Sequence, residues 1–224
     1  MYKMVTAERK TKAYFFTGLG ADKRIFQKIK LPENYEIIFV EWIEPFQKES
    51  FRAYCIRLLK NINTSEPFVF VGLSFGGMVA TELCKLCNPQ KLILISSIST
   101  SAELPNRYRF FYFMGLYSIM PVFLIKSVNI FTYWFVGAKS KESRYLLKQI
   151  LKDTSSVFLK WALTQNVKWK NTERPKMIIH IHGTDDKLLN HNKTRAEIKI
   201  IGGGHLMVFD KADEIILELA KILN

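Results

Sequence analysis

Almost continuously apolar runs, rich in β-branched and aromatic residues, recur along this 224-residue chain, and most are followed by a segment with helical periodicity. A strand with one solvent-exposed face alternates apolar and polar residues, whereas a parallel strand covered by helices on both faces is apolar throughout. The pattern therefore predicts an α/β fold with a doubly wound, mostly parallel sheet of about six strands. The runs are AYFF at 13–16, YEIIFV at 35–40, PFVFVGL at 67–73, KLILISS at 91–97, KMIIHIH at 176–182 and AEIKII at 196–201, and the helical segments are 22–30, about 48–62, 75–87 and 211–223.

The alternation breaks once, over nearly eighty residues between the runs at 91–97 and 176–182. A connection that long seldom lacks structure of its own, so we expect helices there, with Pro105 and Pro121 starting or separating them. Residues 103–170 would form a helical insertion above a core made of residues 1–102 and 171–224. The apolar stretch 110–125 is cut by Pro121 and is shorter than the roughly twenty residues of a membrane span, so no transmembrane helix is predicted.

The chain is strongly basic, with 33 Lys and Arg against 20 Asp and Glu and a net charge of +13. This balance favours acidic partners or a lysine-rich, solvated surface, but no dense basic run interleaved with aromatic residues suggests nucleic-acid binding. Met1 to Lys12 lacks the apolar run of a secretory signal. Three cysteines, Cys55, Cys84 and Cys87, are too few for a disulfide framework, and we expect a cytoplasmic protein.

The segment FVFVGLSFGGMVATEL at 68–83 brings a strand and a helix together at Ser74, which stands between Gly72 and Gly76. A strand, Gly-x-Ser-x-Gly and a helix form the pattern of a nucleophile elbow, a strained turn that lifts the serine hydroxyl above the sheet edge. A Cβ atom two residues before or after the serine would collide with such a turn. A purely structural turn with a serine that caps the helix could have the same sequence, but the strand-to-helix context favours the elbow.

A serine hydroxyl becomes a good nucleophile only beside a base that a third group orients, and the late part of the chain offers both. IIHIHGTDDKLLN carries Asp185 and Asp186 directly after one strand, and IKIIGGGHLMVFD carries His205 after the next. Because the carboxyl ends of parallel strands share one edge of the sheet, we expect Ser74, an aspartate and His205 to meet there.

The segments GLSFGG, HGTDD and GGGHLMVF resemble the elbow, acid loop and histidine loop of the α/β-hydrolase superfamily, and the resemblance covers nearly the whole chain. It implies a catalytic triad of Ser74, His205 and Asp186, because the family's acid usually stands three positions after a glycine such as Gly183. Asp185 is the other candidate for the acid.

The resemblance also implies an oxyanion hole made by the backbone N–H groups of Leu19 and Phe75. The loop before Leu19 carries Thr17 where the family commonly has histidine. Because the donors are backbone groups, this difference concerns the support of the loop and not the hole itself.

The predicted activity is hydrolysis of a carboxylic ester or thioester with an apolar acyl group, through an acyl-enzyme and with neither a cofactor nor a metal ion. Residues 103–170 resemble the helical cap, or lid, of the α/β-hydrolase superfamily, and they are rich in aromatic and aliphatic side chains for the acyl group or for packing onto the sheet. Their eleven Lys and Arg against three Asp and Glu, a net charge of +8, suggest that the cap docks with an acyl carrier protein, a CoA nucleotide or a lipid surface. The aromatic residues are Phe110, Phe111, Phe113, Trp134 and Phe135.

Other functions fit parts of the sequence. The same triad serves acyl transfer and lyase chemistry, and a catalytically silent binding relative is a further alternative. Gly18-x-Gly20 with Glu41 imitates the dinucleotide fingerprint of a nicotinamide-dependent reductase, although Lys23 occupies the third glycine position. The remaining histidines and the Cys84–Cys87 pair lack the spacing of a metal site.

Overall fold

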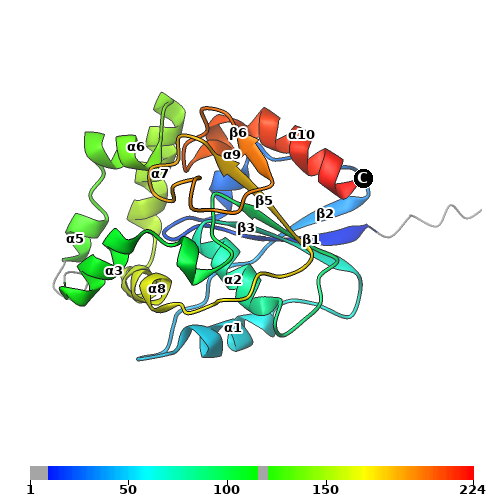
Figure 1. Cartoon of the computed structure of the whole chain (residues 1–224), viewed down its shortest axis with the longest axis horizontal. Helices are drawn as coiled ribbons and strands as arrows, with labels where there is room; N and C mark the ends of the chain where they lie inside the picture. The colour runs from blue at the N-terminus through cyan, green and yellow to red at the C-terminus, as the bar shows by residue number, and fades with distance from the viewer. Residues whose placement is uncertain (1–9, 116–120) are drawn as a thin grey trace, which may run out of the picture.

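The computed structural model describes residues 10–115 and 121–224, which form one six-stranded sheet with helices on both faces (Figure 1). The strand order is β2-β1-β3-β4-β5-β6, and every neighbouring pair is parallel. The predicted fold class is confirmed. The strands are β1 (Thr11–Phe16), β2 (Tyr35–Phe39), β3 (Phe68–Leu73), β4 (Lys91–Ile95), β5 (Ile178–Gly183) and β6 (Ile198–Ile200).

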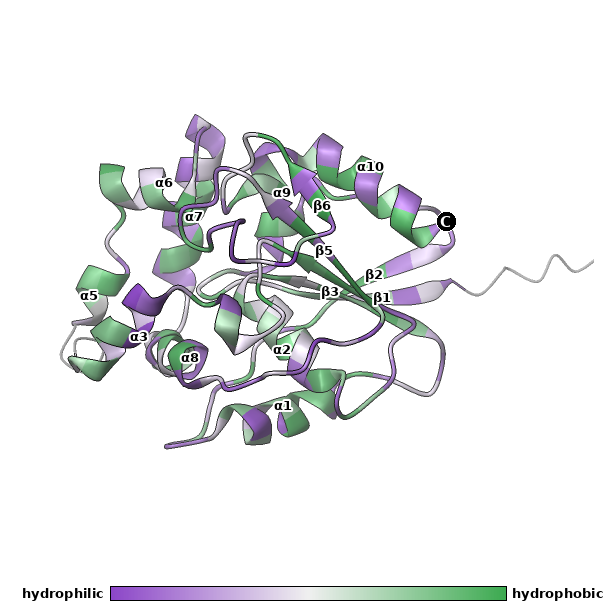
Figure 2. Ribbon diagram, viewed as in Figure 1, coloured by the Kyte–Doolittle hydropathy of each residue, from purple (hydrophilic) through white to green (hydrophobic). Residues whose placement is uncertain are grey.

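The apolar character of the central strands follows from burial on both faces. All six residues of β3 are buried, and Figure 2 shows the hydrophobic colour running through the middle of the sheet. One face is covered by α1 (Phe51–Leu59) and α2 (Phe75–Leu83), the other by the 3-10 helix η1 (Lys23–Phe26), α9 (Met207–Asp210) and α10 (Ala212–Leu223). Two cores result, one on each side of the sheet.

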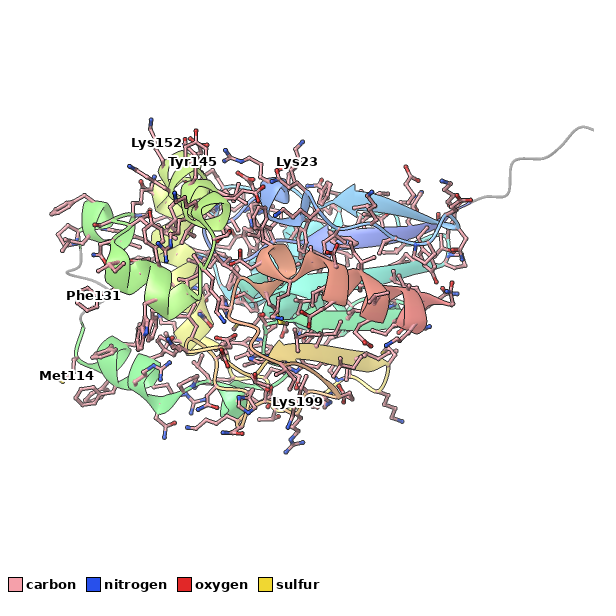
Figure 3. All side chains as sticks on the ribbon, turned by 90° about the horizontal axis from the view of Figure 1, so that it is seen from above. Lys23, Met114, Phe131, Tyr145, Lys152 and Lys199 are labelled. Atoms are coloured by element: carbon pink, nitrogen blue, oxygen red, sulfur yellow. The ribbon has the colours of Figure 1, made fainter. Side chains whose placement is uncertain are left out.

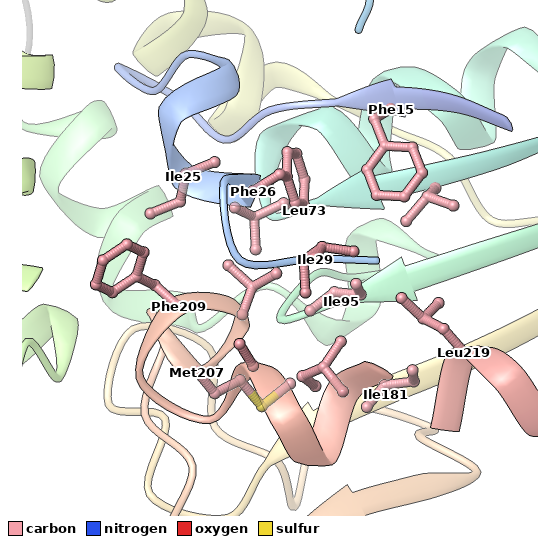
Figure 4. Packing of buried hydrophobic residues seen from close by; sticks show 14 of the residues in the cluster. Phe15, Ile25, Phe26, Ile29, Leu73, Ile95, Ile181, Met207, Phe209 and Leu219 are labelled. Carbon is pink, nitrogen blue, oxygen red and sulfur yellow. The ribbon is translucent and has the colours of Figure 1, made fainter. Parts of the chain in front are cut away.

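Successive residues of a strand point to opposite faces and so enter different cores. Tyr14 and Phe16 of β1 pack with α1 and α2, whereas Phe15 between them packs on the other side. Figure 4 shows this second core, in which side chains from the strands meet those of η1, α9 and α10.

The long connection between β4 and β5 is helical, as predicted. Figures 1 and 3 both show its helices gathered at one end of the sheet. Pro105 directly precedes α3 and Pro121 directly precedes α5, where the missing N–H of proline costs no helical hydrogen bond. The elements are η2 (Ser101–Glu103), α3 (Asn106–Phe113), α5 (Val122–Ile125), α6 (Ile130–Val136), α7 (Lys141–Asp153) and α8 (Ser156–Lys168).

Two sequence predictions touch segments that the structure does not describe. Residues 116–120 of the apolar stretch 110–125, and residues 1–9 of the amino-terminal stretch, lie outside the described residues. Within the described ranges, none of the helices combines the length and the apolar character that crossing a membrane requires.

The helix predicted over 22–30 is wrong in type. Only Lys23–Phe26 form a helix, and it is a 3-10 helix. Ile25, Gln27 and Ile29 each donate a backbone hydrogen bond to the residue three positions earlier. These tight turns place Ile25, Phe26 and Ile29 against the sheet, which satisfies the same apolar spacing that an α-helix would need.

The strand order sets the position of the site. From β1 the chain moves to β2 on one side, and then crosses to β3 on the other side, so a switch point lies between β1 and β3. Ligands of open α/β sheets bind beyond the carboxyl ends of the strands at such a point. Residues following β1 and β3 meet there, beneath the helical insertion.

Candidate active site

Ser74 lies on the turn between β3 and α2 with φ 51° and ψ −120°, a backbone conformation that is strained for any residue other than glycine. The neighbouring strand holds it in place. Ser74 N–H donates to the carbonyl of Ile95 over 3.0 Å, and the Ser97 hydroxyl donates to the carbonyl of Ser74 over 2.6 Å. The strained turn predicted from the sequence is present.

The two glycines around Ser74 stand where no side chain fits. A Cβ atom on Gly72 would lie 2.5 Å from the Cα of Gly77, and one on Gly76 would lie 2.3 Å from the carbonyl oxygen of Thr17. Both neighbours are backbone atoms that cannot rotate away. Helix α2 therefore packs on its own strand and on the end of β1 at backbone distance, which brings the loop after β1 next to the serine.

Gly76→Ala is expected to lower the free energy of unfolding by about 3 kcal/mol, because the new methyl group overlaps fixed carbonyl groups. In a chain of this size that corresponds to a fall of roughly 6–12 °C in Tm by thermal denaturation. Gly18→Ala is the matched control, because its nearest neighbour would be the Ser74 Cβ at an ordinary 3.5 Å. A Tm for Gly76→Ala equal to that of Gly18→Ala would contradict this packing.

His205 and Asp186 lie beside the serine. His205 Nε2 is 2.8 Å from Ser74 Oγ, and His205 Nδ1 is 2.7 Å from Asp186 Oδ2. Asp186 follows β5 and His205 follows β6, so all three side chains extend from the same edge of the sheet. Both residues are buried, and the exposed fractions of the His205 and Asp186 side chains are 9% and 0%.

The two neighbouring aspartates have different surroundings. Asp185 is half exposed and lies 3.4 Å from the Lys139 ammonium, away from the imidazole of His205. Asp186 Oδ1 accepts hydrogen bonds from the N–H groups of Leu188 and Leu189, each over 2.9 Å. Burial alone would raise the pKa of Asp186, but His205 and His182 outweigh it and hold that pKa well below its ordinary value. Asp186 is thus held as a carboxylate.

From the sequence, His182 either faces the surroundings of the sheet or supports the acid loop, and the structure places it beside Asp186. Its Nε2 donates to the carbonyl of Leu189 over 2.8 Å and lies 3.3 Å from Asp186 Oδ2. With that proton on Nε2, the Nδ1 of His182 accepts from His180 Nε2 over 3.0 Å. Burial lowers the pKa of His180, which keeps this imidazole neutral. The i, i+2 spacing in the sequence could have predicted this contact between His180 and His182, because it places both side chains on one face of β5.

The two residues whose amides are predicted to form an oxyanion hole line the same cavity as the serine. They are Leu19 and Phe75, and within the described part of the chain neither N–H has a hydrogen-bond acceptor. The loop before Leu19 is supported although histidine is absent. The Thr17 hydroxyl donates to the carbonyl of Ala21 over 2.8 Å, and Ala21 N–H donates back to Gly18 over 3.0 Å.

Ser74 and His205 lie in the wall of a cavity of about 330 Å³ between the sheet edge and the helical insertion. Most of its other walls are aliphatic. The core contributes Met78, Ile98 and Leu206, and the insertion contributes Ile125, Val136, Leu147, Ile150, Leu151, Leu159 and Leu163.

The expectation that the aromatic residues of the insertion hold the acyl group or pack onto the sheet is wrong for four of the five. Phe110, Phe111, Phe113 and Trp134 are exposed, and none of these four or Phe135 lines the cavity. The aliphatic part of the expectation agrees with the structure, because leucine and isoleucine side chains of α7 and α8 line the cavity. The sequence shows that these aromatic residues are apolar, but it does not show which face of each helix points toward the cavity and which toward solvent.

The reductase alternative loses its structural basis. The Gly18–Gly20 loop leads into the four-residue η1, whereas a dinucleotide pyrophosphate binds at the start of a long helix. In the described ranges, no group of three His, Cys, Asp or Glu side chains is arranged to hold a metal ion. Burial raises the pKa of Cys84 to about 12 and that of Cys87 to about 11, so both thiols stay protonated.

Comparison with known proteins agrees with this architecture. A model of the "Alpha/beta hydrolase family" matches residues 37–218. A hydrolase from Pseudomonas aeruginosa PA01 has a TM-score of 0.75 at 14% identity, with 97% of this chain and 91% of that chain covered. A bromoperoxidase from Bacillus anthracis has a TM-score of 0.70 at 15% identity (96% and 92% covered).

An esterase from Exiguobacterium antarcticum superimposes with a TM-score of 0.66 at 14% identity, over 95% of this chain and 91% of that chain. At these identities the structural matches show a shared fold and nothing about substrates. Among curated proteins no significant sequence match is found.

Proposed function

The chain belongs to the alpha/beta hydrolase family, and on that premise we propose that it is a serine hydrolase that cleaves carboxylic esters or thioesters of an apolar acyl group. Ser74 is the nucleophile, His205 the general base and acid, and Asp186 the group that orients His205. The observation that carries the proposal is the 2.8 Å separation between His205 Nε2 and Ser74 Oγ.

The hydrogen bond to Asp186 defines the tautomer of the base. A carboxylate only accepts, so the His205 proton sits on Nδ1 and the lone pair of Nε2 faces the Ser74 hydroxyl. As Oγ attacks the carbonyl carbon, its proton moves to Nε2, and the buried carboxylate stabilises the imidazolium. The imidazolium then gives this proton to the departing alcohol or thiol, which leaves an ester on Ser74.

Water completes the reaction. His205 takes a proton from a water molecule that attacks the acyl-enzyme, and returns the proton to Ser74 as the carboxylic acid leaves. In both steps the negative charge on the former carbonyl oxygen is received by the N–H groups of Leu19 and Phe75. A donor of this kind contributes about 3 kcal/mol to the stability of the transition state.

The cavity supports an apolar acyl group as the substrate. Its aliphatic walls offer few polar partners, and its volume of about 330 Å³ exceeds what an acetyl group fills. We assign the role of a lid to residues 103–170, with residues 1–102 and 171–224 as the catalytic core. Acyl transfer and lyase chemistry on the same triad are distinguished by product analysis with and without an added alcohol acceptor.

Turnover of p-nitrophenyl esters from acetate to decanoate is the direct test, and Leu163→Trp sharpens it. Leu163 is half-buried in the cavity wall, so the larger indole takes space that a long chain needs. We expect kcat/KM for the decanoate to fall about tenfold and that for the acetate to change less than about twofold. Leu217→Trp, on the exposed face of α10, is the control. Equal losses on both esters, or no turnover of any ester by the native protein, would contradict the proposal.

A further inference from the structure

Helices α3, α5 and α6 present large apolar side chains to solvent. Phe113 is 88% exposed, Phe131 77% and Phe123 70%, and none of the described side chains in α3 and α6 is buried. Figure 3 places Met114 and Phe131 at the same end of the molecule, away from the sheet. Scattered single residues of this kind are ordinary, but a group on adjacent helices marks a binding surface. This apolar edge comprises Phe110, Phe111, Phe113, Met114, Phe123, Leu124, Ile130, Phe131 and Trp134.

The charge around the apolar edge has one sign. Residues 104–141 contain five Lys or Arg and no Asp or Glu. Arg107 and Lys126 donate to backbone carbonyls, of Leu188 over 2.9 Å and of Thr154 over 2.5 Å. Lys139 pairs with Asp185 of the core over 3.4 Å, but within the described ranges neither Arg107 nor Lys126 is paired with a carboxylate, so the net charge of this segment stays positive.

The three carboxylates of the insertion are all bound to the core. Glu103 is buried and accepts from the Ser99 hydroxyl over 2.6 Å. The other two form ion pairs, Glu142 with Lys28 and Asp153 with Arg24, each over 2.7 Å. The acids of the insertion are therefore all engaged with core residues, and none of them is paired with a cation of residues 104–141 in the described part of the chain.

We propose that the apolar edge docks on the surface of a bilayer that contains anionic lipids. Aromatic side chains and cations together suit the boundary between headgroups and acyl chains, where each buried apolar group and each nearby cation adds to binding. A fluid headgroup layer can accommodate projecting side chains at any spacing. A protein partner would need a complementary pocket for each of these side chains. A second copy of this chain would bring like charges together, which opposes self-association through this edge.

The same helices also form one wall of the cavity. Tyr108 of α3, Ile125 of α5 and Thr132 and Val136 of α6 line it from within. Docking through the outer face of these helices would bring this wall against the lipid, so that acyl substrates enter from the bilayer. This last step rests on the proposed function, whereas the docking itself does not.

Sedimentation with vesicles tests the docking. The full chain is mixed with phosphatidylcholine vesicles that contain or lack phosphatidylserine, at low and at physiological salt. We expect at least about tenfold tighter binding to the anionic vesicles, and weaker binding as salt rises. The variant Phe113→Ser/Phe123→Ser/Phe131→Ser should bind at least about tenfold more weakly, because three apolar side chains leave the interface.

A triple variant elsewhere on the surface is the control. Ile56→Ser/Ile201→Ser/Leu217→Ser removes three exposed apolar side chains from other elements and should bind as the native protein does. Ser74→Ala should also bind normally, which separates docking from catalysis, and the first triple variant should keep its turnover of p-nitrophenyl acetate. Native protein that ignores anionic vesicles, or equal binding by both triple variants, would overturn the proposal. The proposal would also be overturned if the first triple variant still bound vesicles but lost self-association or the binding of an acyl carrier protein.

Discussion

Ser74→Ala is expected to lower kcat for every ester by about 10⁶-fold while leaving the protein folded. The loss is large because the variant has no oxygen to form the acyl-enzyme, and His205 then has no proton to accept. The fold should persist because the bonds that hold the turn come from the backbone of Ser74 and not from its hydroxyl. Alanine at φ 51° carries about the same strain as serine, so we expect a stability change below about 1 kcal/mol.

Ester turnover, thermal denaturation and labelling with a fluorophosphonate measure this result. The native protein should carry the label on the peptide that contains Ser74, and Ser74→Ala should carry none. Ser127→Ala, which alters a serine outside the cavity wall, should label and turn over as the native protein does. Turnover by Ser74→Ala within about tenfold of the native rate, or a label on another peptide, would contradict the assignment.

The sheet could be predicted because its cause is local. Strands buried on both faces must be apolar throughout, and segments such as FVFVGL meet this requirement with consecutive apolar residues. The loops bearing Ser74 and His205 follow for a related reason, since glycines mark the places where backbones approach closely. The position of these loops at one sheet edge needs only the rule that parallel strands end together.

Two features could not be derived from the chemistry of the residues alone, because they depend on how a turn or a helix is rotated. Asp185 and Asp186 are adjacent and chemically alike, so only the family resemblance favours Asp186 in the sequence, and the turn after Gly183 decides which carboxylate faces His205. The exposed aromatic residues of α3 and α6 have the composition of a buried helix, and the packing of α7 and α8 decides that they face outwards. Hydrophobic periodicity encodes neither orientation.

Asp186→Asn is expected to lower kcat by about 10⁴-fold, and Asp185→Asn by less than about twofold. The two variants remove the same charge one residue apart, so a general change in the field of the protein would affect both. Only Asp186 bonds to His205, and the half-exposed Asp185 interacts with Lys139. Steady-state turnover of one ester by the two variants and the native protein decides between the aspartates.

The same pair should differ in acid stability. Because the pKa of Asp186 is lower in the folded state than its ordinary value of 3.8, its charge contributes stability that is present above that value. This contribution is lost as the pH falls from 3.8 toward the folded-state value. Asp186→Asn lacks it, so its stability should depend less on pH below 3.8 than that of Asp185→Asn. Urea unfolding at pH 3 and pH 6 measures the difference.

The size of the expected loss comes from the donors that surround Asp186. If the asparagine oxygen replaces Oδ1, it still accepts from Leu188 and Leu189, but the amide NH₂ then points at His205 Nδ1 and toward His182 Nε2. His205 must move its proton to Nε2 to accept from that amide, and Nε2 can then no longer take the proton of Ser74. The flipped amide instead sets its NH₂ against two backbone N–H groups, which costs more. Equal activity of Asp186→Asn and Asp185→Asn would mean that His205 is oriented by another group, and the triad would have to be reassigned.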